Sequence, residues 1–165
     1  MKVFLVEDEF VIREGIKKNI DWEGAGYNFV GEAGDGELAL PLIKKTEPDI
    51  LITDIKMPFM NGLELSRLVK QQLPDTEIII LSGYDEFEYA KEGINIGVAD
   101  YLLKPVNGAE LLASVDTVRD HIIEKQKERE LYEHYKRETA ENFLKEKKDF
   151  FDDLAMEGVT NKEEY

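Results

Sequence analysis

The sequence contains no cysteine, and it lacks any long apolar run. The absence of cysteine excludes disulfide bonds, thiolate metal sites and thiol-based catalysis. No stretch approaches the ~18 consecutive apolar residues of a membrane-spanning helix. No basic and apolar leader precedes the first strand-like run, residues 2–6. We therefore expect a soluble, cytoplasmic protein that does not bind a membrane.

Basic residues are scarce relative to acidic ones. The chain has 21 Lys and Arg against 36 Asp and Glu, and its formal net charge is −15. Proteins bind the phosphate backbone of nucleic acids through clustered Lys and Arg. We therefore expect this chain itself to bind no nucleic acid. Local clusters of acidic side chains point instead to a divalent cation.

Apolar runs alternate with amphipathic segments five times along the chain. Runs at 3–6, 27–33, 50–53, 77–81 and 98–103 predict strands, and segments that begin near residues 10, 35, 63, 85 and 107 predict helices. The third and fourth runs are apolar almost throughout, which is typical of parallel strands covered on both faces. The sequence therefore predicts a five-stranded, parallel, doubly wound α/β domain over residues 1–120.

Several residues mark or disturb the predicted helices. Three pairs match the capping box, in which a polar residue and a glutamate three positions later satisfy the first backbone amides: Asn61 and Glu64, Asp85 and Glu88, and Asn107 and Glu110. Pro41 lies inside the second predicted helix, where proline removes one backbone hydrogen bond. We expect a kink or a late start in that helix.

The last predicted helix has no evident stop before Gly158. Residues 123–153 contain no glycine or proline and are rich in Glu and Lys, so a helical extension is predicted over 121–165, ending at Gly158 and frayed from Asn161. Apolar residues recur along it, but Arg129 and Lys136 occupy seam positions of the heptad that continues from Ile122. Two interpretations stay open: a solvated extension, or a dimerising or signal-transmitting helix of coiled-coil type.

Polar residues follow four of the five predicted strands. Glu7 and Asp8 follow the first, Asp54 the third, Ser82 the fourth and Lys104 the fifth. Because parallel strands bring their carboxyl ends to one edge, these side chains should converge. Three carboxylates repel one another unless a cation joins them, and Mg²⁺ prefers oxygen ligands. A carboxylate nucleophile, a metal, a lysine and a hydroxyl form the set needed for phosphoryl transfer to Asp54.

In order and spacing, these residues resemble the receiver domain of two-component response regulators. The resemblance rests on residues 6–9 (Val-Glu-Asp-Glu), 54–62 (Asp-Ile-Lys-Met-Pro-Phe-Met-Asn-Gly), 81–83 (Leu-Ser-Gly) and 100–105 (Asp-Tyr-Leu-Leu-Lys-Pro). It covers residues 1 to about 120 and implies the flavodoxin-like receiver fold. It also implies a signalling phosphoacceptor rather than an enzyme, one that catalyses only its own phosphorylation and slow dephosphorylation.

The resemblance implies an acceptor and a metal site. Asp54 would accept a phosphoryl group from the phosphohistidine of a sensor histidine kinase. Mg²⁺ would be bound by Glu7, Asp8, Asp54 and the backbone carbonyl of Lys56. The acidic pair is Glu-Asp where the family more often has Asp-Asp, a variant that should keep metal binding.

The resemblance also implies a switch. Ser82 and Lys104 would contact the phosphoryl oxygens, and Tyr101 would turn inward when Ser82 moves. The Lys104–Pro105 peptide bond would be cis. The surface formed by the helix after residue 85, the strand at 98–103 and the helix after residue 107 is the usual dimer face of the family. A homodimer is therefore expected through this face, through the C-terminal helix, or through both.

Residues 82–91 and 150–158 narrow the resemblance to regulators of the YesN type. In these proteins a receiver and a long helical linker precede an AraC-type helix-turn-helix domain. This chain contains no helix-turn-helix pair and no basic recognition helix. We expect the transcription-regulating, DNA-binding output domain to be missing, with phosphorylation switching its dimerisation or orientation. The alternative is a stand-alone receiver whose C-terminal helix is itself the output.

Two rival functions account less well for these residues. A phosphatase of the haloacid dehalogenase class needs an aspartate two positions after the nucleophile as its acid and base, and here that position is Lys56. A pseudo-receiver, which binds partners without being phosphorylated, does not explain why Asp54, Ser82 and Lys104 are all present.

Overall fold

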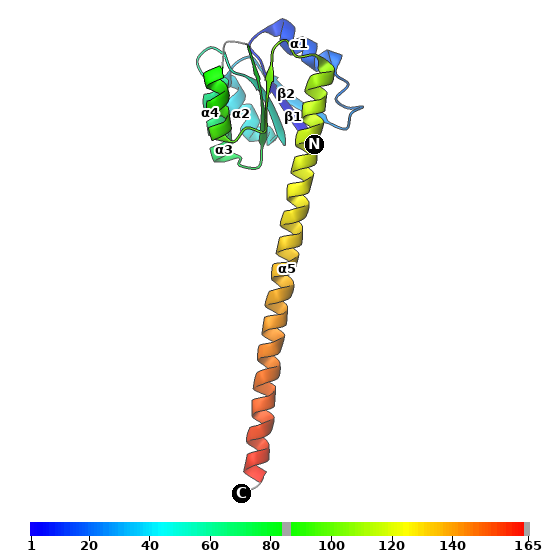
Figure 1. The fold of residues 1–165 in the computed structure, drawn as a ribbon, viewed down its shortest axis with the longest axis vertical. Coiled ribbons are helices and arrows are strands. Elements are labelled where there is room, and N and C mark those ends of the chain that lie inside the picture. The colour runs from blue at the N-terminus through cyan, green and yellow to red at the C-terminus, as the bar shows by residue number, and fades with distance from the viewer. Residues whose placement is uncertain (84–86, 164–165) are drawn as a thin grey trace. The chain divides into compact units, whose positions relative to one another are not determined.

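The computed structural model describes the backbone of residues 1–83 and 87–163, and the side chains of residues 1–83 and 88–155. The chain divides into two units, residues 1–122 and a second unit that begins at Ile123. Strands and helices alternate along the described chain (Figure 1): β1 Lys2–Val6, α1 Phe10–Asn19, β2 Asn28–Ala33, α2 Gly36–Thr46, β3 Ile50–Asp54, α3 Gly62–Gln72, β4 Glu77–Ser82, α4 Phe87–Ile96, β5 Asp100–Leu103 and α5 Gly108–Glu163.

The five strands form one parallel sheet in the order β2-β1-β3-β4-β5. The predicted doubly wound α/β fold is therefore confirmed. Every residue of β3 is buried, and β1 and β4 each have one half-buried residue, at the strand start. These three strands are covered on both faces, which explains why they are apolar almost throughout.

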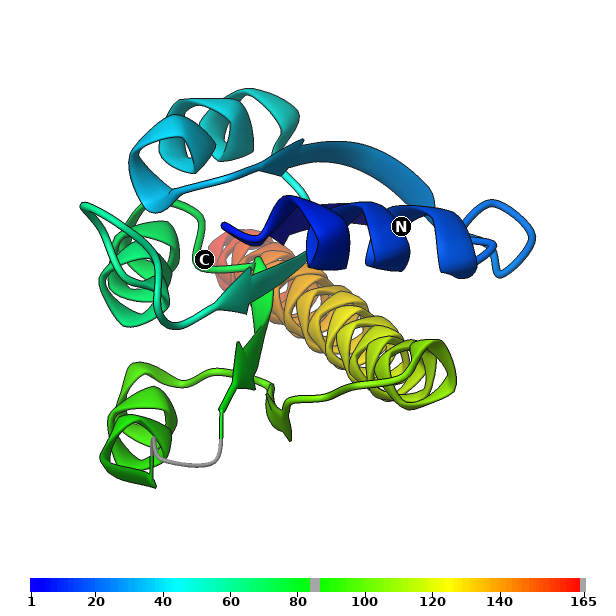
Figure 2. The same ribbon diagram turned by 90° about the horizontal axis from the view of Figure 1, so that it is seen from above.

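Different helices cover the two faces of the sheet (Figure 2). On one face, β1, β3 and β4 pack against the first turns of α5, and Ile16 of α1 lies at the margin of this cluster. On the other face, the same strands pack against α2, α3 and α4. The inward residues of α5 in this unit are Leu111, Val115, Val118 and Ile122.

The helix starts follow the local signals in the sequence. The side chain of Asn61 accepts a hydrogen bond from the backbone N–H of Glu64 at 2.9 Å, and that of Asn107 accepts one from Glu110 at 2.8 Å. Both side chains therefore cap their helices as predicted. The predicted cap Asp85 lies outside the described residues.

The late start considered for α2 and the end expected for α5 at Gly158 are both wrong. Helix α2 does not start late, because the Asp35 side chain accepts a hydrogen bond from Leu38 N–H at 2.7 Å and the helix begins at Gly36, well before Pro41. Helix α5 does not end at Gly158 but continues to Glu163. A glycine inside a helix lowers its stability by only about 1 kcal/mol, so a single glycine need not terminate one.

The second unit is a single helix, the continuation of α5. Large apolar side chains are exposed along it: Leu131, Tyr132, Tyr135, Phe143, Leu144, Phe150, Phe151 and Leu154. Despite these residues, no helix in the described part of the chain is long and apolar enough to cross a membrane. The apolar residues from 143 to 154 recur at spacings of one, three, four and seven, so they share one broad face of the helix.

Candidate functional site

The polar residues that follow the strands meet at one edge of the sheet. Asp54 is the last residue of β3 and lies opposite Leu81 of β4, and Ser82 follows Leu81. Glu7 comes directly after β1, and Lys104 directly after β5. All strands run in the same direction, so these positions share the edge where parallel α/β sheets bind ligands.

Three carboxylates converge at this edge. Glu7, Asp8 and Asp54 each present a carboxylate oxygen, and these oxygens lie within 4.8 Å of one another. Glu7 is completely buried and Asp54 is 5% exposed, whereas Asp8 is exposed. The set therefore has one side open to solvent.

Lys104 places its ammonium group between two of the carboxylates. Its Nζ lies 2.9 Å from Asp54 Oδ2 and 3.1 Å from Glu7 Oε2, and it donates a hydrogen bond to Glu7 Oε1 at 3.3 Å. Burial opposes the charged form of Lys104, but the hydrogen bond and charge of Asp54, together with those of Glu7, outweigh it and raise the pKa of the lysine. Lys104 therefore stays charged in this site.

The two buried carboxyls hold their protons more tightly than usual. Burial, and then the charge of Asp54, raises the pKa of Glu7 to about 7, although Lys104 acts in the opposite direction. Burial also raises the pKa of Asp54, against the hydrogen bond and charge of Lys104 and the backbone N–H of Ile55, which donates to Asp54 Oδ1 at 2.8 Å. One ammonium group does not compensate the negative charge gathered here.

The residues present fit a divalent cation. Among the described residues, Glu7 Oε2 is buried and accepts no hydrogen bond of normal geometry, although the ammonium of Lys104 lies 3.1 Å away. A buried carboxylate oxygen without a hydrogen bond is costly unless another group satisfies it. The atoms available to bind a metal are carboxylate oxygens, which suit Mg²⁺ rather than a soft metal.

The remaining predicted residues belong to β4, to β5 and to the loop after β3. Ser82 is buried at the end of β4, and its hydroxyl donates to the carbonyl of Gly83 at 3.2 Å. Tyr101, in β5, is half-buried and packs against the apolar core on the sheet face that α2, α3 and α4 cover. Lys56 lies in the loop after β3 with its side chain exposed. The Lys104–Pro105 peptide bond is cis.

Two residues that shape the site were not singled out from the sequence. A Cβ atom on Gly62 would lie 2.0 Å from the backbone oxygen of Asp54, so only glycine fits here. The backbone N–H of Gly62 donates a hydrogen bond to the Ile55 carbonyl at 2.8 Å. Arg13 of α1 donates from Nη1 to the Glu7 carbonyl at 2.7 Å. The position of Gly62, directly after the helix cap Asn61, is a sequence signal that could have identified it, whereas no sequence pattern marks Arg13.

Comparison with known proteins identifies the family and the fold. Residues 3–116 match the family described as the response regulator receiver domain. The chain belongs to this family. The receiver covers most of the first unit and includes Glu7, Asp8, Asp54, Ser82 and Lys104.

Similar proteins include receivers and whole regulators. The receiver (REC) domain of AraT, a response regulator from Geobacillus stearothermophilus, is 42% identical with a TM-score of 0.71, over 76% of this chain and 97% of that one. "Uncharacterized transcriptional regulatory protein YesN" from Bacillus subtilis is 43% identical, over 71% of this chain and 32% of its own length. "Transcriptional regulatory protein HptR" from Staphylococcus aureus is 48% identical, over 67% of this chain and 43% of its own length.

The alignments with these curated relatives span about a third to a half of the relatives' lengths. They support a receiver within a transcriptional regulator, and the resemblance to the YesN type, drawn from the sequence, is confirmed.

Proposed function

We propose that this receiver takes a phosphoryl group on Asp54 from the phosphohistidine of a sensor histidine kinase. The observation that carries the proposal is the setting of Asp54. Its carboxylate lies at the carboxyl end of a buried strand, 2.9 Å from Lys104 Nζ and within 4.8 Å of carboxylate oxygens of Glu7 and Asp8. A nucleophilic carboxylate, a mobile cation and a metal-binding acidic pair are together what phosphoryl transfer requires.

In the proposed step, an Asp54 carboxylate oxygen attacks the phosphorus atom. A phosphorus–oxygen bond forms while the phosphorus–nitrogen bond of the phosphohistidine breaks, and the leaving imidazole nitrogen takes up a proton from solvent. Glu7, Asp8, Asp54 and the Lys56 carbonyl would hold Mg²⁺. When bound, Mg²⁺ supplies positive charge to the oxygens of the transferring group.

Lys104 and Ser82 have the second role in the proposal. Lys104 holds Asp54 Oδ2 in the structure described here, and it would transfer this contact to a phosphoryl oxygen once the acyl phosphate has formed. The Ser82 hydroxyl, on the neighbouring strand, would donate to another phosphoryl oxygen. Tyr101 would follow Ser82 inward and change the surface formed by α4, β5 and the start of α5.

We propose that this surface change favours a homodimer and acts on the output of a transcriptional regulator in the cytoplasm. Two apolar side chains are exposed on the face in question, Ile94 of α4 at 75% and Leu103 of β5 at 49%. The exposed apolar residues of the second unit, from 143 to 154, offer a second self-association surface. The names of the relatives, which are transcriptional regulators, support an output that acts on DNA.

The test is phosphoryl uptake from acetyl phosphate in Mg²⁺, read as a mass increase of the intact protein. The protein should take up one phosphoryl group, and chelation of Mg²⁺ should prevent uptake. Asp54→Asn should take up none, whereas Asp152→Asn, which changes an exposed aspartate of the second unit, should behave like the parent. Equal uptake by Asp54→Asn and the parent would refute the acceptor assignment.

A steady-state phosphatase is the weaker candidate. Two positions beyond Asp54 stands Lys56, an amine in place of the carboxyl that such an enzyme needs as acid and base. With an aryl phosphate, the receiver should therefore release product as a burst of up to one equivalent, followed only by the slow release that its own dephosphorylation allows. The proposed chemistry is limited to its own phosphorylation and a slow dephosphorylation.

A further inference from the structure

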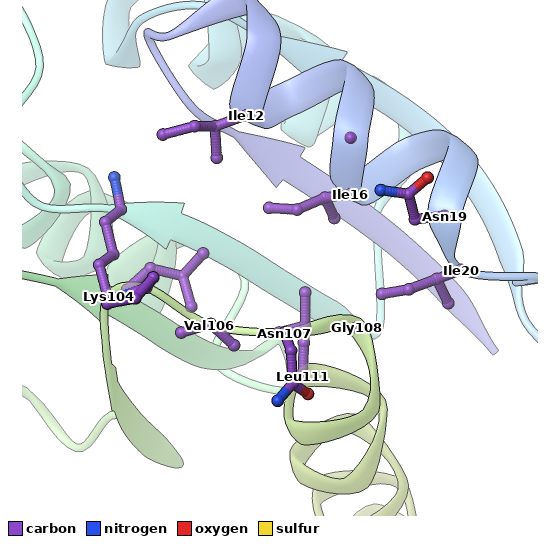
Figure 3. A pocket seen from close by; sticks show the side chains of 12 residues that line it. Ile12, Ile16, Asn19, Ile20, Lys104, Val106, Asn107, Gly108 and Leu111 are labelled. Carbon is purple, nitrogen blue, oxygen red and sulfur yellow. The ribbon is translucent and has the colours of Figure 1, made fainter.

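An apolar cleft of about 510 Å³ lies between α1 and the start of α5. One wall is formed by Ile12, Ile16 and Ile20, and Figure 3 shows them facing Lys104, Val106 and Leu111 across the cleft. The floor includes Leu81, near the end of β4. Pockets of about 300–1,000 Å³ with mostly apolar linings are typical of small-molecule sites.

The packing of α1 explains why the cleft is open. None of residues 10–19, all of which the structure describes, is buried, although Ile12 and Ile16 lie on the inward face. Two positions along the cleft are glycines, Gly15 on α1 and Gly108 at the start of α5. A Cβ atom at Gly15 would meet only Asn19 Nδ2, at 3.7 Å. There is therefore room for a larger side chain or for a ligand.

The charges around the cleft limit what it can hold. Among the described residues that line it, only Lys104 is charged, and its ammonium is already paired with Asp54 at 2.9 Å and Glu7 at 3.1 Å. An anion would have to compete with these two carboxylates, and a cation would be repelled by the lysine. A charged ligand would also lose its hydration against an apolar lining. The exposed amide side chain of Asn19 supplies a neutral hydrogen-bonding group, and that of Asn107, whose Oδ1 already accepts from Glu110 N–H, supplies an NH2 donor.

We propose that this cleft is a binding site for an uncharged, compact, largely apolar small molecule that carries one hydroxyl or carbonyl group. The apolar part would lie between the three isoleucines and Leu111, and the polar group would bond to Asn19 or Asn107. The ligand would lie against the loop that carries Lys104. This site is separate from the acceptor carboxylate, and its occupancy does not require phosphorylation.

Three probes of one shape and different charge test the proposal: adamantan-1-ol, adamantane-1-carboxylate and 1-aminoadamantane as the ammonium ion. Binding to the full chain is followed by ¹H–¹⁵N NMR. The single tryptophan provides a sensitive reporter, because Trp22 is buried and its indole N–H donates to the Ile16 carbonyl at 3.3 Å. The alcohol should shift this signal and the amides of 12–20 and 106–111, with each charged probe binding roughly tenfold or more weakly.

A pair of variants at one position localises the binding. Gly15→Leu should fill the cleft and abolish the shifts, whereas Gly15→Ala, which changes helix propensity without filling it, should keep them. Val106→Phe narrows the opposite wall and should also weaken binding, so the test does not rest on one variant's folding. Absence of binding by the alcohol, tighter binding of a charged probe, or shifts unaltered in a folded Gly15→Leu or Val106→Phe protein would overturn the proposal. Phosphoryl uptake is measured separately, so either result can fail alone.

Discussion

At the scale of single residues, Lys104 keeps two buried carboxylates close together. It lies 2.9 Å from Asp54 and 3.1 Å from Glu7, and its side chain is 23% exposed. Replacing it by methionine keeps the aliphatic part but leaves both carboxylates without their cation. We expect the free energy of unfolding of the metal-free protein to fall by about 1–3 kcal/mol, as for other buried polar groups that lose a partner.

Urea denaturation of the Lys104→Met protein in EDTA measures this loss. Lys145→Met, an exposed lysine of the second unit, is the matched control and should change the free energy of unfolding by less than about 0.5 kcal/mol. Phosphoryl uptake from acetyl phosphate should also slow in the Lys104 variant alone. Equal stability of the two variants would show that Lys104 does not hold the carboxylates.

The raised pKa of Glu7 predicts a pH dependence. In the folded state burial and Asp54 raise the pKa from 4.5 to about 7, so between these values the folded protein keeps a proton that the unfolded chain has released. The contribution of the Glu7 proton to the free energy of unfolding is therefore fully present below pH 4.5 and is lost as pH rises toward 7. In EDTA, the free energy of unfolding should fall over this range, and Glu7→Gln, which does not ionise, should show a smaller fall.

The control for this titration is Glu130→Gln, which changes an exposed glutamate of the second unit. It should retain the slope of the parent protein. A slope in Glu7→Gln equal to that of the parent would assign the titration to another group.

Most of the site follows from where residues fall relative to the predicted strands. A parallel sheet brings strand ends together, so Glu7, Asp54 and Lys104 could be predicted to meet. The roles of Gly62 and Arg13 could not be predicted, because they depend on distances between segments. At Gly62 a Cβ atom would lie 2.0 Å from a backbone oxygen. The Arg13 side chain reaches the carbonyl of a residue six positions earlier. Periodicity and composition contain neither distance.

At the scale of elements, Tyr27 attaches the first turns of α5 to the rest of the first unit through its hydroxyl and its ring. The Tyr27 ring is buried, its hydroxyl donates to Asp116 Oδ1 at 2.5 Å, and Arg119 lies 3.3 Å from the same oxygen and 5.8 Å from the ring centre. Burial, and then the hydrogen bond to Asp116, raises the pKa of Tyr27 far above its usual value. This contact joins the segment before β2 to α5.

Tyr27→Phe removes the hydroxyl and keeps the ring. We expect the free energy of unfolding to fall by about 1.5 kcal/mol, because a hydrogen bond to a charged acceptor is lost. Tyr132→Phe, on a side chain that is 66% exposed in the second unit, should have no measurable effect. Thermal or urea unfolding of both variants makes the comparison, and a destabilisation shared by both would argue against the contact.

The type and order of the elements were predictable, and their exact limits were less so. Alternating apolar and amphipathic runs indicated all five strands and helices of the first unit. Gly158 predicts an end for α5 that is wrong, since the helix continues to Glu163. The gap beneath α1 could not be predicted, since Ile12, Ile16 and Ile20 have the spacing of a well-packed helix face.

At the scale of the whole molecule, two surfaces expose apolar side chains that are suited to self-association. One is the α4–β5–α5 face with exposed Ile94 and Leu103, and the other is the apolar stripe of the second unit, which includes Phe143 and Phe150. We expect a monomer in Mg²⁺ alone and a dimer when beryllofluoride, an acyl phosphate mimic, is added. Light scattering measures both states.

Variants assign the surface. Leu103→Glu should prevent the dimer formed with beryllofluoride, whereas the double variant Phe143→Glu and Phe150→Glu should leave it intact. A dimer present without beryllofluoride and lost only in the double variant would assign association to the second unit. Phosphorylation would then rearrange an existing dimer.

The central claim is that Asp54 is the phosphoacceptor, and the most direct measurement identifies the modified residue itself. The protein is incubated with acetyl phosphate and Mg²⁺, the acyl phosphate is reduced with borohydride, and the peptides are sequenced by mass spectrometry. Reduction of an aspartyl phosphate gives homoserine, which we predict at position 54 and not in the Asp54→Asn protein. Homoserine at another aspartate, or at none while the intact protein carries a phosphoryl group, would contradict the account.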